Sequence, residues 1–243
     1  MKWVRDQTGR FPERPHYEPD ELDQECEAII SGFLRSKHDS VTYPVITDDL
    51  VRLLQRETQD LDLYADLTQE GKDVEGVTDF FPSQKPRVRI ARELSEQTWR
   101  QNRLRTTLTH ELGHVKFHNF MRSFTQLALP LSVDQSNSRQ TVRCRRDTIL
   151  GASTVDWMEW QAGYMSGAFL MPVAPLRRVV GELFEREKVY GPALLNSPVG
   201  QELIREVQKT FEVSADAARV RLLKLGHITK KTPSRSLFSS EGS

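Results

Sequence analysis

The residue types best suited to chemistry in this sequence lie within five positions. The segment His110-Glu111-Leu112-Gly113-His114 places two histidines four residues apart. In a helix such residues share one face, so both imidazoles could reach one divalent ion at about 2 Å. Glu111 could take a proton from a water molecule beside that ion, as a general base. The segment therefore predicts a metal-dependent hydrolytic site, and Zn²⁺ is the ion that we expect.

The helix that must carry this motif is predicted from about Ser95 through His118. At about 100° per residue, His110 and His114 lie roughly 40° apart on the helical wheel. The adjoining arc is apolar and consists of Leu104, Leu108, Leu112 and Val115. An apolar arc of this kind would anchor the helix and hold its ligands in place. The alternative interpretation is a pair of solvated histidines on an exposed helix face.

A zinc site of this kind needs a third protein ligand and one open position. His118 lies about 12 Å from His110 along a regular helix axis, too far to share the ion. We expect His118 to border the cleft or to orient a ligand. Glu159, near the start of a predicted helix, is the better candidate, and Asp156 is the alternative. Either carboxylate could also be an ordinary acidic residue in a first helical turn.

Two further roles remain to be assigned. Hydrolysis needs a donor for the developing oxyanion, and the candidates are His118, Tyr164 and Arg145, each of which could instead be structural. Cys144 is flanked by arginines in the sequence RCRR, and such cations lower the pKa of a thiol. Its thiolate could occupy the open position on zinc in a resting state, as a redox-sensitive regulatory latch. The alternative is a plain surface or packed cysteine.

The bulk composition argues against several classes of protein. Acidic and basic residues both total 34, so the formal net charge is zero and does not favour nucleic acid as a direct partner. Two cysteines are too few for a disulfide-stapled secreted fold. No apolar run suits a signal peptide or reaches the roughly 20 residues of a membrane-spanning helix. We therefore expect a cytoplasmic protein with no membrane partner.

The chain divides into four predicted parts. Residues 1–18, rich in proline, arginine and aromatic residues, are expected to form an extended arm. Residues 19–190 are expected to form a mostly helical α+β domain with a small β-sheet. Residues 191–228 are predicted to be a helical subdomain that packs on the core, with a helix-turn-helix as the alternative. Residues 229–243 are expected to be a disordered tail.

Hydrophobic periodicity predicts the elements that position the motif. Strands are expected at 61–67, 76–81 and 87–90, where Pro82 and Pro86 favour a hairpin or a sheet edge. Residues 119–156 are expected to be loop-rich. The predicted helices begin near Pro19, Thr47, Ser95, Trp157 and Pro175, and a last one is capped by Ser214 and ends at Gly226. Cys26 falls in the apolar stripe of the first helix, as a core thiol would.

Two segments together resemble the ImmA/IrrE family of metallopeptidases. They are HELGHVKFH, residues 110–118, and MEWQAGYMSGAFLMP, residues 158–172. In that family a HELGH-type helix is followed by a Glu-x-x-Ala segment that runs into Leu-Met-Pro. The resemblance covers roughly Val77 to Pro172, and FEVSADAARVRLLKLG is similar to the helical C-terminal part of the family. It implies a zincin-like fold and Glu159 as the third ligand; Mn²⁺ or Fe²⁺ could replace Zn²⁺ in such a site.

The resemblance also implies a protein substrate. Such proteins cleave helix-turn-helix repressors of the Xre type, and we expect one encoded nearby. The sequence departs from the family in the long segment between the two motifs, which contains QTVRCRRDT, and no obvious DNA-binding domain precedes the motif. One rival is a non-catalytic regulator that inactivates a repressor by binding it, although such a protein would not need Glu111. The other is a nucleic-acid-binding regulator that uses the C-terminal helices and the KKTPSR segment of the tail.

Overall fold

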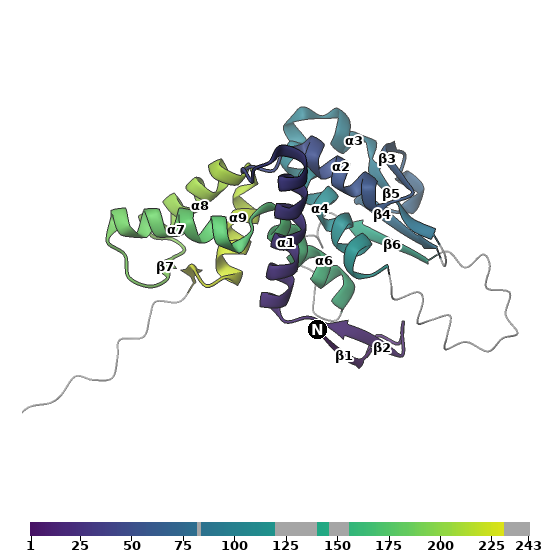
Figure 1. Ribbon diagram of the computed structural model, residues 1–243, viewed down its shortest axis with the longest axis horizontal. Helices are drawn as coiled ribbons and strands as arrows, with labels where there is room; N and C mark the ends of the chain where they lie inside the picture. The colour runs from purple at the N-terminus through teal and green to yellow at the C-terminus, as the bar shows by residue number, and fades with distance from the viewer. Residues whose placement is uncertain (82–83, 120–139, 146–155, 231–243) are drawn as a thin grey trace, which may run out of the picture.

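The computed structural model describes residues 1–81, 84–119, 140–145 and 156–230. This part of the chain contains helices, a four-stranded sheet and two small two-stranded sheets. The four-stranded sheet lies at one side of the molecule (Figure 1). The fold is therefore α+β, the class that we expected. None of the described helices combines the length and the apolar character needed to cross a membrane.

The four-stranded sheet has the order β3-β5-β4-β6. Strands β4 (Val74–Phe81) and β5 (Gln84–Ala91) form the predicted antiparallel hairpin, and β3 (Asp60–Ala65) runs parallel to β5. Strand β6 (Gln140–Arg145) pairs antiparallel with β4 at the edge.

Strand β6 corrects the expectation that residues 119–156 are loop-rich throughout. Its residues alternate, since Val142 packs against a cluster that includes Trp157 and Met158. Cys144 lies beside His110 and Glu111, whereas Arg143 binds Glu70. Alternation with a period of two is the signature of a half-buried strand. The rest of that expectation lies outside the described residues.

The helix that carries the motif is shorter than predicted. Ser95 lies in α3 (Arg92–Glu96), and a 3-10 turn at Thr98–Arg100 leads into α4 (Gln101–Phe117). Gln97 is extended, with φ −99° and ψ 101°, and therefore separates α3 from the turn. The hydroxyl of Ser95 donates to the carbonyl of Leu63 on β3 at 2.6 Å, which holds α3 against the sheet instead of in line with α4.

Helix α4 is enclosed by other elements, since α2 (Thr47–Glu57), α6 (Trp157–Leu170) and strand β4 all pack against it (Figure 1). Helices α2 and α6 begin where the sequence predicts, and α6 ends at Met171-Pro172 as expected. Gly113 allows α6 to come close, because a Cβ there would lie 3.3 Å from the Cα of Ala162.

Helix α1 (Pro19–His38) packs on α6 and starts at the predicted proline. Most of its apolar stripe is buried, and Cys26 lies within it with no exposed surface, as predicted for a core thiol. The two long helices that carry the predicted ligands, α4 and α6, are thus supported on several sides.

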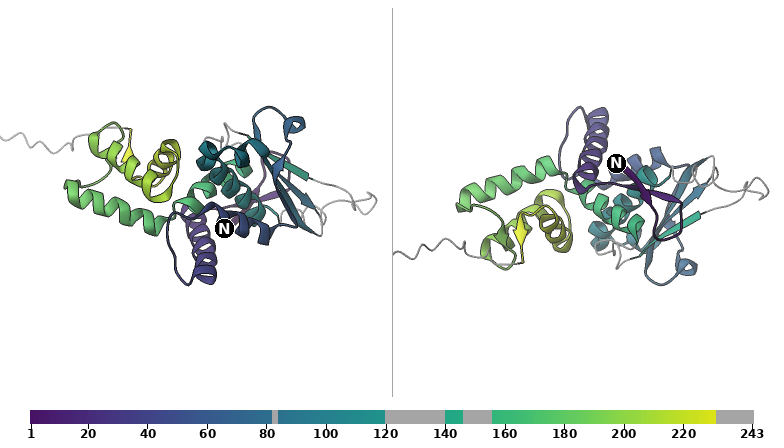
Figure 2. Two further views of the ribbon diagram at one scale, coloured as in Figure 1. Left: turned by 90° about the horizontal axis from the view of Figure 1, so that it is seen from above. Right: turned by 90° about the horizontal axis from the view of Figure 1, so that it is seen from below.

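The C-terminal helices gather at the end of the molecule away from the four-stranded sheet (Figures 1 and 2). They are α7 (Val173–Glu187), α8 (Pro198–Phe211) and α9 (Ala215–Lys224). The short strands β7 (Ala193–Leu194), after α7, and β8 (Ile228–Thr229), after α9, pair with each other. The predicted cap is present, because the hydroxyl of Ser214 accepts from the amide of Ala217 at 3.1 Å.

The predicted C-terminal boundaries fall at elements that pack against one another. Helix α7, which we placed in the 19–190 domain, packs against both α1 and α8. Thr229, which we placed in the tail, is part of β8 and pairs with Leu194 of β7. The remainder of the predicted tail, from residue 231, lies outside the described residues.

The N-terminal residues form a hairpin and not the extended arm that we expected. Strands β1 (Lys2–Arg5) and β2 (Glu13–His16) pair antiparallel. The Asp6 carboxylate accepts from the amides of Thr8 at 3.0 Å and Phe11 at 3.1 Å, which fixes the turn. It also accepts from the indole of Trp157 at 3.2 Å, so the hairpin is attached to the start of α6.

Candidate metal centre

Three predicted ligands converge from two helices. Nε2 of His110 lies 3.1 Å from Nε2 of His114, and the Glu159 carboxylate oxygens lie 3.3 Å and 3.1 Å from these two nitrogens. In a tetrahedral site with bonds of about 2.0–2.1 Å, two ligand atoms are roughly 3.3 Å apart. The spacing of these three side chains therefore fits a single divalent ion.

The burial of the same atoms also fits a cation. His110 and His114 have no exposed surface, and Glu159 is 6% exposed. Neither carboxylate oxygen of Glu159 has a hydrogen-bond partner among the described residues, although both lie close to the ring nitrogens. A buried carboxylate without donors is costly unless a positive charge compensates it. Two imidazoles and one carboxylate suit Zn²⁺, and also Mn²⁺ or Fe²⁺.

Glu159 and His114 shift each other's pKa in opposite directions. Burial alone would raise the pKa of Glu159, but the charges of His114 and His110 outweigh it, and the pKa lies well below its usual range. Burial alone would lower the pKa of His114, but Glu159 and then Glu111 outweigh it, and the pKa is raised. The negative charge on Glu159 is thus favoured at neutral pH, as binding a cation requires.

The alternative ligand, Asp156, takes a different position. It precedes α6, and its Oδ1 accepts from Nη2 of Arg10 at 2.6 Å at the surface. The structure therefore brings Glu159, and not Asp156, to the two histidines.

Glu111 lies beside the cluster and is fully buried. One of its oxygens, Oε2, accepts a hydrogen bond from the hydroxyl of Thr78 on β4, and Oε1 has no partner among the described residues. Burial raises the pKa of Glu111, although His114, His110 and the Thr78 hydroxyl lower it in part. A carboxylate with a raised pKa is suited to both accepting and returning a proton.

Gly76 provides the space that Glu111 occupies. A Cβ at Gly76 would overlap Oε1 of Glu111 and would lie 2.9 Å from its Cδ. The absence of a side chain on β4 therefore lets the carboxylate lie between helix and sheet.

His118 orients His114 through a chain of hydrogen bonds. The carbonyl of Pro15 can only accept, so the Gln161 amide nitrogen donates to it at 3.1 Å, which turns Oε1 of Gln161 towards Nε2 of His118 at 3.0 Å. Nε2 of His118 must then donate, and its Nδ1 accepts from Nδ1 of His114 at 2.9 Å.

This chain leaves Nε2 of His114 free to act as a ligand. Burial and the neighbouring His114 lower the pKa of His118 to about 3, so its ring is neutral, as the chain requires. His118 thus contacts a predicted ligand, and it is in neither group of possible metal ligands among the described residues, in agreement with the helix-axis argument. Its Nε2–H is engaged by Gln161, which makes it a poor oxyanion donor.

The other two predicted oxyanion donors lie elsewhere. The hydroxyl of Tyr164 donates to Oδ2 of Asp23 on α1 at 2.8 Å, because Tyr164 lies on the face of α6 that packs against α1. Arg145 is exposed at the end of β6, and neighbours in a strand face opposite sides, so it points away from the side on which Cys144 meets α4. The Tyr164 hydroxyl is therefore engaged away from the predicted metal ligands. The assignment of Arg145 stays a prediction.

Cys144 lies inside the site. It is placed there by its proximity to His110 and Glu111, and not by the arginines beside it in the sequence. Its Sγ, a ring nitrogen of His110 and a carboxylate oxygen of Glu111 all lie within 4.8 Å of one another. Burial raises the pKa of the thiol well above its ordinary value, and Glu111 and Glu159 raise it further. The expected lowering of this pKa by the flanking arginines is wrong, because the effect of burial is the largest one. Arg143 binds Glu70, and Arg145 is exposed.

Three residues of the site were missed in the sequence. Gly76 had a signal, since a glycine inside a strand pattern often marks a close approach of another group. Thr78 follows two residues later and therefore faces the same side of β4. Gln161 had no such signal in the sequence, because its role depends on a hydrogen bond to the carbonyl of Pro15, which is far away in the chain.

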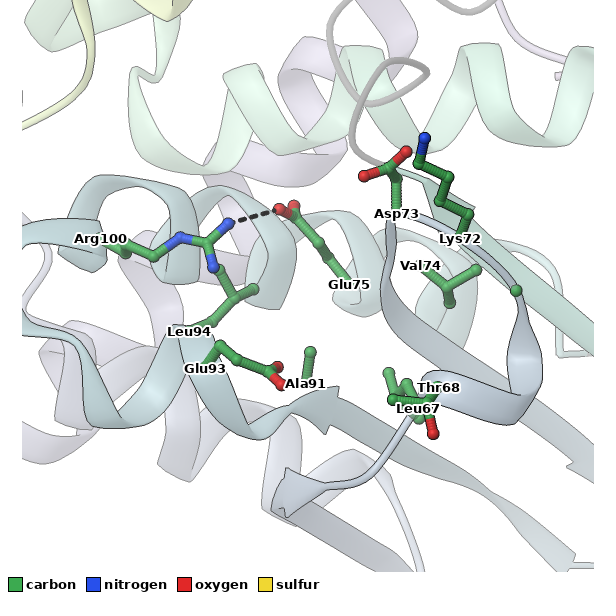
Figure 3. Close-up of a pocket in the computed structure, with 11 residues that line it drawn as sticks. Leu67, Thr68, Lys72, Asp73, Val74, Glu75, Ala91, Glu93, Leu94 and Arg100 are labelled. Carbon is green, nitrogen blue, oxygen red and sulfur yellow. Dashed lines mark hydrogen bonds and ion pairs between the residues drawn. The ribbon is translucent and has the colours of Figure 1, made fainter.

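A separate pocket of about 420 Å³ opens next to this region (Figure 3). It lies between the start of β4 and α3, and the guanidinium of Arg100 donates to Glu75 across it at 3.1 Å. Glu75 directly precedes Gly76 on β4, so the pocket begins one residue from the point where the sheet meets Glu111.

Compared with known proteins, the chain matches no family model and no curated protein. The function proposed below therefore depends on the geometry of the site and on the two motifs of residues 110–118 and 158–172.

Proposed function

We propose that this protein is a metal-dependent endopeptidase with a zincin-like fold. His110, His114 and Glu159 would hold the ion, and Glu111 would be the general base. The observation that supports this most strongly is the spacing of 3.1–3.3 Å among the three ligand atoms, in a site where the Glu159 oxygens have no hydrogen-bond partner.

Each residue of the site would have its own role in peptide hydrolysis. A bound Zn²⁺ supplies Lewis acidity, which polarises a peptide carbonyl and lowers the pKa of a water molecule towards 7. Glu111 takes the proton of the attacking water and returns it to the leaving amine. Thr78 holds one oxygen of Glu111 and leaves the other free for this transfer. His118 and Gln161 hold the His114 ring in the orientation that ligation needs.

The proposed substrate is a helix-turn-helix repressor of the Xre type, cleaved to relieve repression. The resemblance of the two motifs to the ImmA/IrrE family supports this choice.

The test combines metal content with proteolysis. The purified chain is incubated with a repressor encoded beside its gene, with and without chelator, and the products are identified by mass spectrometry. Glu111→Gln should keep one equivalent of metal and lose hydrolysis by about 10²–10⁴-fold, the usual contribution of a general base. His114→Gln should lose the metal itself.

His16→Gln is the matched control, because His16 is on β2 and pairs with Glu18 at 3.4 Å, outside the cluster. Cleavage at the normal rate by Glu111→Gln would refute the assignment of the base. A repressor that the metal-loaded protein binds but leaves intact would replace the peptidase by the regulator that acts through binding.

A further inference from the structure

Strand β6 places Cys144 in a row of residues that faces α4. Cys144 is paired with Gly76 on β4, and Gly76 is paired with Ile90 on β5. Because Gly76 has no side chain, nothing in this row separates the sulfur from Glu111, whose carboxylate fills the space over the glycine. The position of the thiol is therefore a consequence of the sheet register.

The thiol forms a second cluster that shares one residue with the metal centre. His110 belongs both to the group with His114 and Glu159 and to the group with Glu111 and Cys144. All members of the second group have no exposed surface. Oε1 of Glu111 and Nδ1 of His110 are buried there without a hydrogen-bond partner among the described residues.

The sulfur lies on the side of the centre where catalysis needs a water molecule. That water must sit between the ion and Glu111, at the position which the three protein ligands leave open. Cysteine sulfur is a favoured ligand of zinc, and sites with four protein ligands are structural, whereas catalytic sites keep one position open. A thiolate from Cys144 would turn an open site into a closed one.

We propose that Cys144 is a fourth protein ligand that closes the metal centre in a resting state. This inference rests on the proposed function, because it assumes an ion at His110, His114 and Glu159. On closing, the bond between sulfur and metal forms, the water molecule leaves and the thiol proton passes to Glu111. Opening reverses these steps, and no electrons are transferred.

Closing requires a movement of β6 towards the other two ligands. The sulfur lies within reach of His110 and Glu111 and has to approach His114 and Glu159. β6 is the edge strand, and in the described sheet it is hydrogen-bonded to β4 alone. An edge strand with one neighbour can shift with less loss of hydrogen bonds than an inner strand. A shift of β6 could therefore bring Cys144 to the ion and withdraw it again.

The test uses the spectrum of Co²⁺ in place of the native metal. The full chain loaded with Co²⁺ should show a thiolate-to-cobalt charge-transfer band in the near ultraviolet. Cys144→Ser should bind Co²⁺ and lose the band. Cys26→Ser is the matched control, since Cys26 is the other buried cysteine of the chain and lies in α1, so this variant should keep the band.

Hydrolysis gives a second readout. If the closed state holds about nine-tenths of the molecules, Cys144→Ser should cleave substrate roughly tenfold faster than the unaltered protein. If both Cys144→Ser and Cys144→Ala fail to fold, X-ray absorption at the zinc edge of the unaltered protein replaces them. It should show one sulfur neighbour at about 2.3 Å.

The outcomes separate this inference from the proposed function. Co²⁺ bound without a charge-transfer band, or zinc with nitrogen and oxygen neighbours alone, overturns the role of Cys144 and leaves the peptidase proposal intact. A failure of the unaltered protein to bind either metal overturns both. A band that persists in Cys144→Ser overturns the role of Cys144 as well.

Discussion

At the scale of single residues, the position of the Glu111 carboxylate depends on the Thr78 hydroxyl and on the absence of a side chain at Gly76. Glu111 is held by the hydroxyl of Thr78, and it fits between helix and sheet because position 76 is glycine. The backbone of Gly76 shows no positive φ, so the glycine is needed for space and not for conformation.

Gly76→Ala should therefore displace the general base. The added Cβ would lie 2.9 Å from Cδ of Glu111 and 3.0 Å from Cγ2 of Thr107, so the carboxylate must move. We expect hydrolysis to fall by about 10²-fold or more, in the range of losing a general base, while metal content stays at one equivalent.

The matched control is Gly32→Ala in the interior of α1, where a Cβ would meet nothing within 4 Å. This change should stabilise the protein by about 0.5–1 kcal/mol, because alanine favours helix over glycine. Normal activity of Gly76→Ala would mean that Glu111 does not need its observed position.

At the scale of elements, the site is assembled from α4, α6 and the N-terminal hairpin. Gly113 lets α6 approach α4 closely enough for Glu159 to meet both histidines. The hairpin contributes the carbonyl of Pro15, which orients Gln161 and, through it, His118. A segment that looks like an arm in the sequence thus takes part in fixing a ligand.

Gln161→Leu should weaken metal binding by about 10–100-fold, the usual cost of losing a partner that orients a metal ligand. Competition with a chelator of known affinity measures this change. Gln161→Glu, which keeps an acceptor for His118, should retain more affinity than the leucine variant. Gln55→Leu on the exposed surface of α2 is the control, and equal affinities in all four proteins would contradict the hydrogen-bond chain.

At the scale of the whole molecule, a buried ion pair joins helix α1 to helix α9. Nη2 of Arg221 on α9 lies 2.7 Å from Oδ1 of Asp23 on α1, and Tyr164 on α6 donates to the other oxygen. Nε of Arg221 also donates to the carbonyl of Met171 at 3.1 Å. Since Asp23 and Arg221 are 4% and 2% exposed, the C-terminal helices are attached to the core through desolvated charges.

Removing either partner of this pair should destabilise the fold. Arg221→Leu or Asp23→Asn leaves a buried polar group uncompensated, and each should lower the free energy of unfolding by about 3–5 kcal/mol. The double variant should lose less than the sum of the two. Urea unfolding measures all three, and Arg219→Leu, whose partner Asp216 is exposed, should change stability by less than about 1 kcal/mol. Strict additivity would contradict the coupling.

Features with local causes could be predicted from the sequence. The spacing of His110 and His114, the helix at 157–170 and the starts of α1 and α2 depend on neighbours a few residues away, and the structure has them as expected. Glu159 could be named as a ligand because the second motif adds to its position. That the site holds a metal and cleaves peptides stays a prediction.

Other features were decided by partners far apart in the chain. Ser95 bonds to Leu63, Tyr164 turns to Asp23, and Cys144 reaches Glu111 only through its pairing with Gly76. The upward shift of the pKa of the Cys144 thiol follows from its burial, which the neighbouring arginines in the sequence do not reveal. Helical spacing is a property of one segment, whereas sheet register, burial and the choice of hydrogen-bond partner exist only once distant segments have packed.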